Sequence, residues 1–267
     1  MLNKLLNNVL LWYNIFKISK KSTGGKVMYM VNVTSDNFAE KVKSIKTIVV
    51  PIGSVEAHGH HLPLGTDIFS PRVFCNMLEE KIGDVVWIAP EIPFGQSYDL
   101  SIYPGTIHVP TEVLAQYVYE VGRSLFENGI KNIIFLNGHG GNVNALNLAS
   151  EKLMALGAAA LTINWWVDYS KDILTITEGQ GHGGEDETSA VLFYNESLVE
   201  MDKAIINNRK PTMRMYFKDR GKVIYKDALS GNSTLANKEK GEKIFSLVSD
   251  RIIETINMVI SETYYTD

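Results

Sequence analysis

The feature that most constrains the fold is a repeated alternation of short apolar runs and longer helical segments along the chain. The apolar runs are short and rich in β-branched residues, which is typical of buried strands. The expected strands are Thr47–Ile52, Val85–Ala89, Ile133–Leu136 and Leu161–Trp165. The expected helices are Pro71–Ile82, Thr111–Asn128, Asn144–Leu156, Glu185–Asn195 and Lys238 to about Thr263. This order predicts an α/β fold of one domain, with a mostly parallel sheet and helices on both of its faces.

The helix expected at Thr111–Asn128 has the clearest end signals. Thr111 is the expected N-cap residue, Glu112 places a carboxylate in the first turn, and Gly129 follows the last turn. Parallel sheets of this kind place their chemistry beyond the carboxyl ends of the strands. Polar residues that follow a strand are therefore the first candidates for a functional site.

Charge and cysteine content exclude several classes of partner and site. A net charge of -4 gives no electrostatic reason to expect nucleic acid or an anionic membrane surface as partner. The one cysteine, Cys75, allows no intramolecular disulfide and no zinc site built from thiolates. Cys75 falls inside an expected helix, so we expect a buried apolar side chain rather than a nucleophile.

The N-terminal segment is apolar from Met1 to Phe16 but is interrupted by lysine and asparagine. It is too short and too polar to span a bilayer, and it lacks the small-residue cleavage site of a signal peptide. We expect residues 1–30 to be an extension that precedes a domain at 31–267, with a translation start at Met28 or Met30 as the alternative. The rest of the chain has no long apolar run, so we expect a cytoplasmic protein.

Five of the six histidines fall in three short polar segments. The segments are GSVEAHGHHLPLGTD (residues 53–67), NGHGGN (residues 137–142) and GHGGEDETSA (residues 181–190). The first two directly follow expected strands, where the fold places its chemistry. Of His60 and His61, one is expected beside the functional site and the other to be a packing residue. The remaining histidine, His108, is expected to be structural.

Carboxylate and imidazole side chains in the first two segments predict a metal site. Glu56 and His58 are two residues apart, so they point to the same side of an extended chain. With Asp67 and His139 they make a mixed oxygen and nitrogen ligand set, which suits Zn²⁺, Mn²⁺ or Fe²⁺. The four residues suffice for one ion. Alternatively, a bridging carboxylate holds two ions ~3.5–4 Å apart, and such a site activates water for amide hydrolysis.

The third segment supplies a candidate proton carrier. His182 lies in a glycine-rich loop ahead of the expected helix, and a histidine suits protonation of a leaving amine. Glu185 and Asp186 fall in the first turn of that helix, where acids are expected from the helix dipole alone. Thr188 and Ser189 have no convincing base beside them, so we reject a serine-hydrolase mechanism.

Taken together with YPGTI (residues 103–107), these segments resemble the creatininase family in both sequence and order. The resemblance covers roughly residues 48–195. It implies two divalent metal ions held by Glu56, His58, Asp67 and His139, with Asp67 as the bridge. It also implies that His182 lies near the substrate as a proton shuttle, and that the protein is a cytoplasmic homohexamer.

The chain departs from the creatininase pattern at two positions. Creatininases carry a glutamate metal ligand two residues after the motif histidine, where this chain has Gly141. The second metal must therefore find another ligand, for which Glu185 is the candidate, or bind more weakly; Glu185 is also a candidate catalytic residue. Many relatives carry a histidine ahead of the PGTI segment, where this chain has Leu100. In these changes the chain resembles the branch of the archaeal formylamino-pyrimidine ribotide deformylase, and a branch of peptide-trimming enzymes.

These observations predict a metal-dependent amidohydrolase that acts on a small-molecule amide. The expected bond is a non-peptide C–N bond, in a cyclic amide such as creatinine or in a formamide. Three alternatives stay open: the ribotide deformylase, a metallopeptidase for a short peptide, and a metal-binding protein without catalysis. The expected substrate-binding residues are Ser97, Tyr103, Gly105, Thr106 and Gly140.

Overall fold

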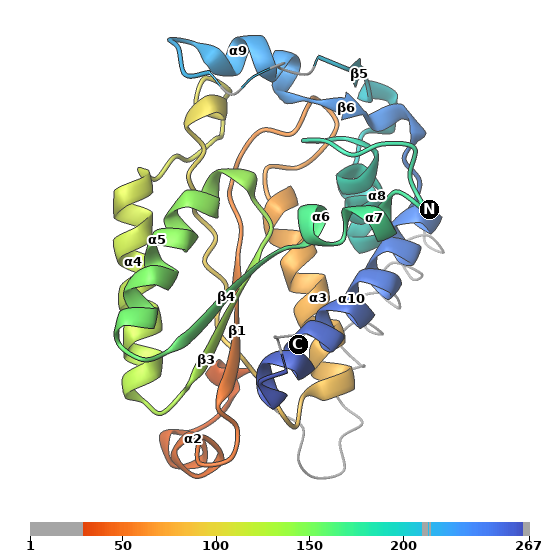
Figure 1. Cartoon of the computed structure of the whole chain (residues 1–267). Helices are drawn as coiled ribbons and strands as arrows, with labels where there is room; N and C mark the ends of the chain where they lie inside the picture. The colour runs from red at the N-terminus through yellow and green to blue at the C-terminus, as the bar shows by residue number, and fades with distance from the viewer. Residues whose placement is uncertain (1–28, 210–212, 214, 264–267) are drawn as a thin grey trace.

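The structure is a computed structural model that describes residues 29–209, 213 and 215–263 (Figure 1). Its centre is a four-stranded parallel sheet with the strand order β2-β1-β3-β4. The strands are β1 (Thr47–Ile52), β2 (Trp87–Ile88), β3 (Asn132–Asn137) and β4 (Ala159–Asn164). This confirms the α/β class and the parallel sheet. Nearly all of the expected N-terminal extension, residues 1–30, lies outside the described residues.

Helices cover both faces of the sheet, as the alternating pattern predicts. The longer helices are α2 (Ser35–Lys41), α3 (Thr66–Ile82), α4 (Thr111–Glu127), α5 (Val143–Ala155), α8 (Glu185–Asn195) and α10 (Lys238–Ser261). The short helical segments are η2 (Met30–Asn32), η3 (Tyr98–Leu100), η4 (Gly140–Asn142), α6 (Trp165–Asp168), α7 (Ser170–Ile173), η5 (Glu196–Leu198), η6 (Met201–Lys203), α9 (Arg220–Ile224), η7 (Lys226–Ala228) and η8 (Ser233–Leu235). A small antiparallel pair, β5 (Ile206–Asn207) and β6 (Gly231–Asn232), belongs to the segment that carries α9.

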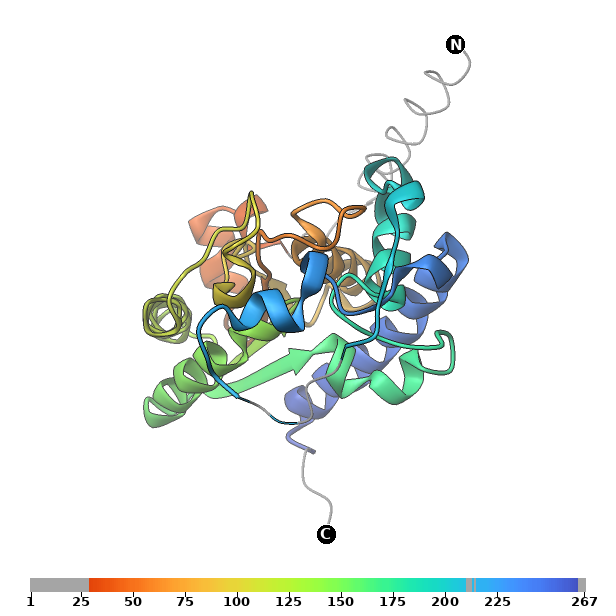
Figure 2. The same ribbon diagram turned by 90° about the horizontal axis from the view of Figure 1, so that it is seen from above.

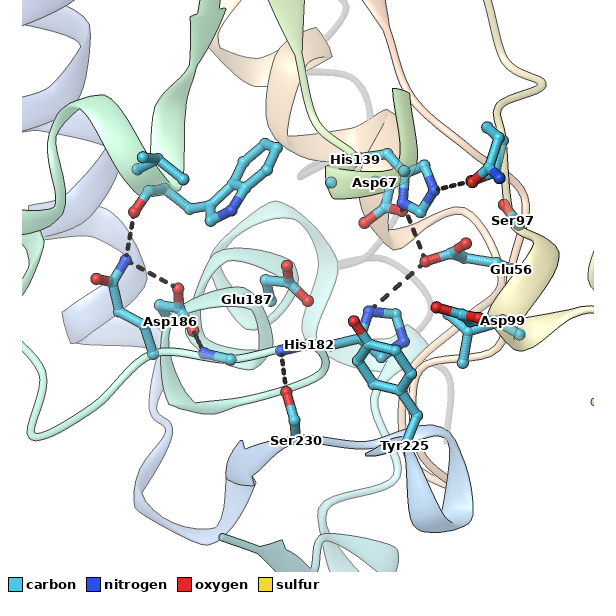
Figure 3. Close-up of a pocket in the computed structure, with 18 of the residues that line it drawn as sticks. Glu56, Asp67, Ser97, Asp99, His139, His182, Asp186, Glu187, Tyr225 and Ser230 are labelled. Atoms are coloured by element: carbon cyan, nitrogen blue, oxygen red, sulfur yellow. Dashed lines mark hydrogen bonds and ion pairs between the residues drawn. The ribbon is translucent and has the colours of Figure 1, made fainter. Parts of the chain in front are cut away.

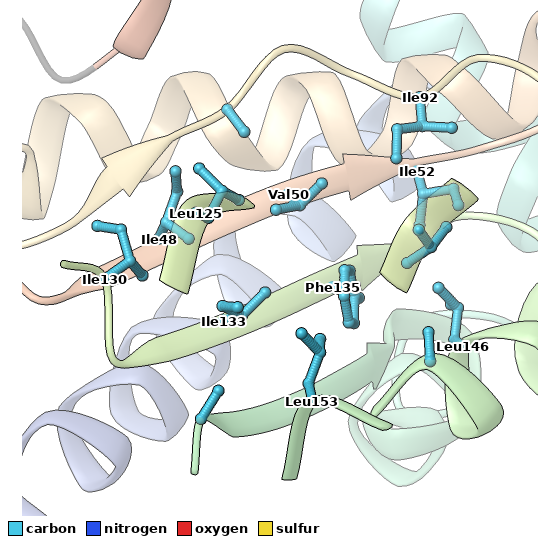
Figure 4. Packing of buried hydrophobic residues seen from close by; sticks show 14 of the residues in the cluster. Ile48, Val50, Ile52, Ile92, Leu125, Ile130, Ile133, Phe135, Leu146 and Leu153 are labelled. Carbon is cyan, nitrogen blue, oxygen red and sulfur yellow. The ribbon is translucent and has the colours of Figure 1, made fainter. Parts of the chain in front are cut away.

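Alternate residues of each central strand enter two different hydrophobic cores. On one face, Val50 and Phe135 pack with apolar residues of α4 and α5 such as Leu125 and Leu146 (Figure 4). On the other face, Val49 and its neighbours pack against α3, α8 and α10. This alternation follows from the two-residue repeat of a strand. Because both faces are covered, the central strands are mostly apolar, and all six residues of β1 are buried.

Most element boundaries shift by a few residues from those expected, and the expectation that Thr111 is an N-cap residue is wrong. The N-cap residue of α4 is Pro110, and Thr111 is the first residue of the helix. No side chain makes a capping hydrogen bond at this end of α4. The helix α3 begins at Thr66 rather than Pro71, which places Asp67 in its first turn. Strand β4 ends at Asn164, and Trp165 already belongs to α6. Gly129 has a φ of 96°, as a glycine that ends a helix requires.

The carboxyl ends of β1 and β3 lie side by side beneath the segment that contains α9. Strands β1 and β3 pair in register from Thr47↔Asn132 to Ile52↔Asn137, so both end at the same level. In the view from above, α9 lies across this end of the sheet (Figure 2). Among the residues that the structure describes, no helix combines the length and apolar character that a membrane span requires.

Candidate metal centre

The loop that follows β1 brings two donor side chains to the carboxyl edge of the sheet. Glu56 and His58 are fully buried there. The backbone between them is fixed by a hydrogen bond from the Ala57 N–H to Thr106 Oγ1, 3.1 Å long, and the Glu56 N–H donates to the Leu64 carbonyl at 3.0 Å. Because the loop is held at these points, both side chains have a defined direction before any ligand binds.

Asp67 lies at the centre of the donor cluster. Its Oδ1 is 2.9 Å from Nε2 of His58, and its Oδ2 is 2.9 Å from Nδ1 of His139. Two groups of donor atoms share this carboxylate: one consists of Glu56, Asp67 and His139, and the other of His58, Asp67 and Glu187. Within each group all donor atoms lie within 4.8 Å of one another. A carboxylate that directs one oxygen into each group has the arrangement of a bridging ligand between two ions.

In their neutral form, which metal binding requires, the histidine rings turn a lone pair towards these carboxylates. Nδ1 of His58 lies 3.1 Å from the Glu56 backbone carbonyl, and Nε2 of His139 lies 2.8 Å from the Gln96 carbonyl. A carbonyl accepts only from N–H, so each neutral ring has its lone pair on the nitrogen that faces Asp67. Metal-binding histidines characteristically donate their second nitrogen to a carbonyl in this way.

Several carboxylate oxygens of the cluster are buried without a hydrogen-bond donor. Among the described residues, neither oxygen of Glu56 nor Oδ2 of Asp67 accepts a hydrogen bond. Burial lowers the pKa of His58, but the charges of Asp67, Glu187 and Glu56 outweigh it and raise that pKa to about 10. The cluster therefore strongly favours positive charge between these groups. Carboxylate oxygen and imidazole nitrogen are ligands of Zn²⁺ and Mn²⁺, so the residues present fit two divalent ions.

Glu185, the expected ligand of the second metal, is paired with a lysine instead. Glu185 is buried and forms an ion pair with Lys240, 2.6 Å long, while its other oxygen accepts the N–H groups of Glu178 and Gly179. It does not belong to any of the donor groups found among the described residues and does not line the cavity, so its expected role as ligand and catalytic residue has no support in this geometry. Two residues along α8, Glu187 belongs to the donor group with His58 and Asp67.

Glu187 is positioned by a hydrogen bond from the backbone just ahead of α8. Its Oε2 accepts the Gly183 N–H at 2.7 Å and lies 3.5 Å from Nε2 of His58. An acid at the third helical position commonly bonds to the backbone just ahead of its helix. That rule was a usable sequence signal, because the backbone ahead of α8 is the loop that carries His182.

His182 faces the cluster from the opposite side to Asp67 (Figure 3). Its Nε2 donates to the Ala57 carbonyl at 2.9 Å, which leaves a lone pair on Nδ1, 3.6 Å from Oε1 of Glu56. Burial and the neighbouring His58 hold the pKa of His182 well below its ordinary value, so the ring is neutral. A neutral imidazole with a free lone pair can accept a proton and pass it on. A third donor group joins His182 with Glu56 and His58, so a role as metal ligand stays an alternative.

Gln96 occupies the space beside Gly141, where creatininases carry a glutamate. A Cβ added to Gly141 would lie 1.9 Å from the Gln96 carbonyl oxygen and 2.8 Å from its side-chain Oε1. The same carbonyl holds His139, and the Gln96 N–H donates to Oδ1 of Asn142 at 2.9 Å. In this chain Gln96 therefore closes the space beside Gly141.

The donor cluster forms one wall of a cavity of about 660 Å³. Among the expected substrate-binding residues, Ser97 and Gly140 line this cavity. Tyr103, Gly105 and Thr106 are not among its lining residues, so their contact with substrate stays a prediction. Tyr103 and Thr106 make hydrogen bonds to backbone, and Gly105 takes a φ of 85° beside Leu64. Further lining residues that the sequence did not reveal are Gln96, Asp99, Leu100, Trp166, Val167, Ser170, Gln180, Asp186, Tyr225 and Ser230.

Of the other histidines, His61 and His108 take supporting positions, whereas His60 is exposed and is not the packing residue that one of the pair was expected to be. His61 is buried, and its Nε2 lies 2.8 Å from Oγ1 of Thr188, next to Glu187. Burial lowers the pKa of His61 to about 4, so the ring is neutral. The side chain of His60 is 61% exposed. His108 is structural, because its Nδ1 accepts the Ser97 N–H at 3.1 Å.

The fold and the paired donor groups define the class of an α/β protein with a candidate two-metal centre. The family model described as "Creatininase: Creatinine amidohydrolase" matches residues 31–256. The chain belongs to the creatininase family.

Individual relatives agree on the family and differ in the substrate that they are named for. The mycofactocin precursor peptide peptidase of Mycolicibacterium smegmatis is 31% identical over 210 residues, which cover 76% of this chain and 81% of that protein. The creatinine amidohydrolase of Pseudomonas putida is 27% identical over 232 residues, with 78% and 88% covered. A solved structure described as "Creatininase Mn" matches with a TM-score of 0.75 and 24% identity, covering 86% of this chain and 98% of that one.

Proposed function

We propose that this chain hydrolyses an amide C–N bond with water activated between two divalent metal ions. The observation that carries the proposal is the placement of Asp67, which directs one oxygen at His58 and the other at His139. Zn²⁺, Mn²⁺ or Fe²⁺ bound here would lower the pKa of a coordinated water to about 7 and polarise the amide carbonyl. Without such activation, water is a poor nucleophile towards an amide at neutral pH.

The residues around the centre supply the remaining steps. Nδ1 of His182 is positioned to accept the proton that water loses as its oxygen attacks the carbonyl carbon. When the C–N bond breaks, the same nitrogen delivers that proton to the leaving amine, and the ring returns to its neutral form. The Nε2–H bond to the Ala57 carbonyl keeps the ring orientation and tautomer fixed throughout. A group that acts in this way typically contributes ~10²–10⁴-fold to the rate.

The cavity lining favours a substrate without a phosphate group. Five acids line it, and none of its described lining residues is lysine or arginine. Three of these acids belong to the metal donor groups, which leaves Asp99 and Asp186 as further negative charges. A phosphorylated ribotide would need cationic or donor-rich contacts away from the metals. We therefore favour an unphosphorylated cyclic amide or formamide as the substrate over the phosphorylated ribotide of the deformylase reaction.

A short peptide is the second candidate substrate. The relatives that are 31% identical to this chain are named peptide peptidases. The cavity volume of about 660 Å³ is in the middle of the range that holds drug-sized ligands, so it has room for more than one small ring. The reaction would be the same, with a peptide amine as the leaving group.

A substrate screen tests the proposed function. Purified chain supplied with Zn²⁺ or Mn²⁺ is incubated with creatinine, the formylamino-pyrimidine ribotide and short peptides, and creatine, formate and free amino acids are measured. We expect hydrolysis of at least one amide, lost in the presence of chelator. Fully metal-loaded chain that hydrolyses none of the three classes would contradict the proposal, and would favour a metal-binding protein without catalysis.

A further inference from the structure

Tyr225 brings a free phenol group to the metal centre. It lines the cavity, and its ring packs edge-on against His182 with ring centroids 5.2 Å apart. Figure 3 shows the phenol oxygen at the end of the ring that faces the carboxylate cluster. This hydroxyl makes no hydrogen bond to any described residue, although the ring is largely buried. A buried hydroxyl that faces a cavity without a partner is available to a ligand.

Hydrogen bonds and an ion pair fix the backbone position of Tyr225. Tyr103 Oη donates to the Tyr225 carbonyl at 2.5 Å. One turn earlier, Nε of Arg220 lies 3.0 Å from Oδ2 of Asp99, and a second guanidinium nitrogen contacts the same carboxylate. Gly221 packs directly on the Asp99 carbonyl, leaving no room for a Cβ. These contacts fix α9 and the following turn to the loop that contains η3. The phenol therefore has a preset position, which is what a catalytic hydrogen-bond donor requires.

We propose that Tyr225 is a catalytic residue that donates its hydroxyl hydrogen bond to the oxygen of the amide carbonyl during hydrolysis. The inference rests on the proposed function. As the water oxygen bonds to the carbonyl carbon, the π electron pair moves onto the carbonyl oxygen, which becomes negative. The Tyr225 hydroxyl stabilises that charge and keeps its own proton. When the C–N bond breaks, the pair returns to re-form the carbonyl, and the leaving nitrogen takes its proton from His182.

The charges around Tyr225 are consistent with a donor that stays protonated. Burial raises the pKa of the phenol, and the carboxylates of Asp99, Glu56 and Glu187 raise it further. These carboxylates also show that the ring lies within electrostatic reach of the donor cluster. The alternative is that Tyr225 only packs against His182, in which case the ring matters and the hydroxyl does not.

The test is Tyr225→Phe, which keeps the ring against His182 and removes only the hydroxyl. We expect kcat to fall by about 10²–10³-fold, as for the loss of one donor to a developing oxyanion. Metal content and melting temperature should be unchanged, and KM should stay within about threefold because the interaction strengthens only in the transition state. Tyr98→Phe is the matched control: this tyrosine is 62% exposed on the neighbouring loop, and its variant should keep wild-type kcat.

The outcomes separate this inference from the proposed function. The same substrate, metal and assay are used for wild type and both variants. Active wild type with a Tyr225→Phe variant that keeps kcat within about threefold overturns the role of Tyr225 and leaves the proposed function intact. A fall in kcat accompanied by loss of metal or of melting temperature assigns Tyr225 a structural role and also overturns it. Metal-loaded wild type without activity on any amide overturns both.

Discussion

Glu185 and Glu187 lie two residues apart in the first turn of α8, yet their carboxylates serve different parts of the molecule. Oε1 of Glu185 is 2.6 Å from Nζ of Lys240 on α10, whereas Oε2 of Glu187 is 3.5 Å from Nε2 of His58. Residues i and i+2 of a helix do not share a face. One carboxylate therefore ties two helices together, and the other reaches the metal centre.

This pair allows a matched comparison of isosteric variants. We predict that Glu187→Gln loses about one equivalent of metal per chain and more activity than the ~10–100-fold typical of a residue that only supports a ligand. Glu185→Gln should keep both metals but leave Lys240 without its counter-charge. Removal of one partner of a buried ion pair lowers the free energy of unfolding by about 3–5 kcal/mol. Because Lys240 is partly exposed, we expect Glu185→Gln to lower it by about 3 kcal/mol or less. Metal analysis and thermal unfolding of both variants check this, and metal loss confined to Glu185→Gln would reverse the assignment.

Asp67→Asn should disturb both metals at once. An amide offers one oxygen instead of two and carries no charge, so it cannot bridge His58 and His139 in the same way. We predict that the variant loses metal from both donor groups and that its hydrolysis falls below that of any variant in a supporting residue. Near-normal metal content together with a near-normal rate would show that Asp67 is not the bridge.

His182→Ala should separate proton transfer from metal binding. We predict retained metal, with a kcat lower by about 10²–10⁴-fold and loss of one limb of the pH–rate profile. A variant that loses about one metal equivalent would identify His182 as a ligand, in line with its donor group with Glu56 and His58. Retained metal with a kcat within about threefold of wild type would remove His182 from the mechanism.

Gly141→Ala tests whether the departure from the creatininase pattern is structural. The added methyl would lie 1.9 Å from the Gln96 carbonyl oxygen and 2.4 Å from Nε2 of His139, so it must break the bond that orients this ligand. We predict a lower melting temperature and weaker metal binding. The adjacent Gly140→Ala is the control, because its methyl meets only Trp166 at 3.7 Å. Equal behaviour of the two variants would count against the role of Gln96 in holding His139.

The sequence predicted the sheet and most of the donor cluster because both depend on local order along the chain. Apolar runs such as Thr47–Ile52 form buried strands. The residues that directly follow such strands lie at the carboxyl edge of the parallel sheet. Glu56, His58 and Asp67 are close in sequence, and His139 follows the strand next to theirs. The parallel pairing of β1 with β3 then brings all four together.

The sequence could not place residues whose position depends on contacts between distant segments. Glu185 is paired with Lys240, 55 residues later, and no local pattern indicates that contact. Tyr225 reaches the cavity because Arg220 and Asp99 join segments 121 residues apart. Tyr103 belongs to the recognisable YPGTI motif, but it does not line the cavity. Its hydroxyl donates a hydrogen bond to the Tyr225 carbonyl instead. Such contacts have no periodic signal in the chain.

The most direct test of the two-metal mechanism is the metal content of active protein, measured together with its rate of amide hydrolysis. Two donor groups share Asp67, so we predict about two equivalents of Zn, Mn or Fe per chain, one for each group. Chelation should abolish hydrolysis, and added Zn²⁺ or Mn²⁺ should restore it as the metal content returns. Undiminished hydrolysis by protein that holds less than about a tenth of an equivalent of any transition metal would contradict the mechanism.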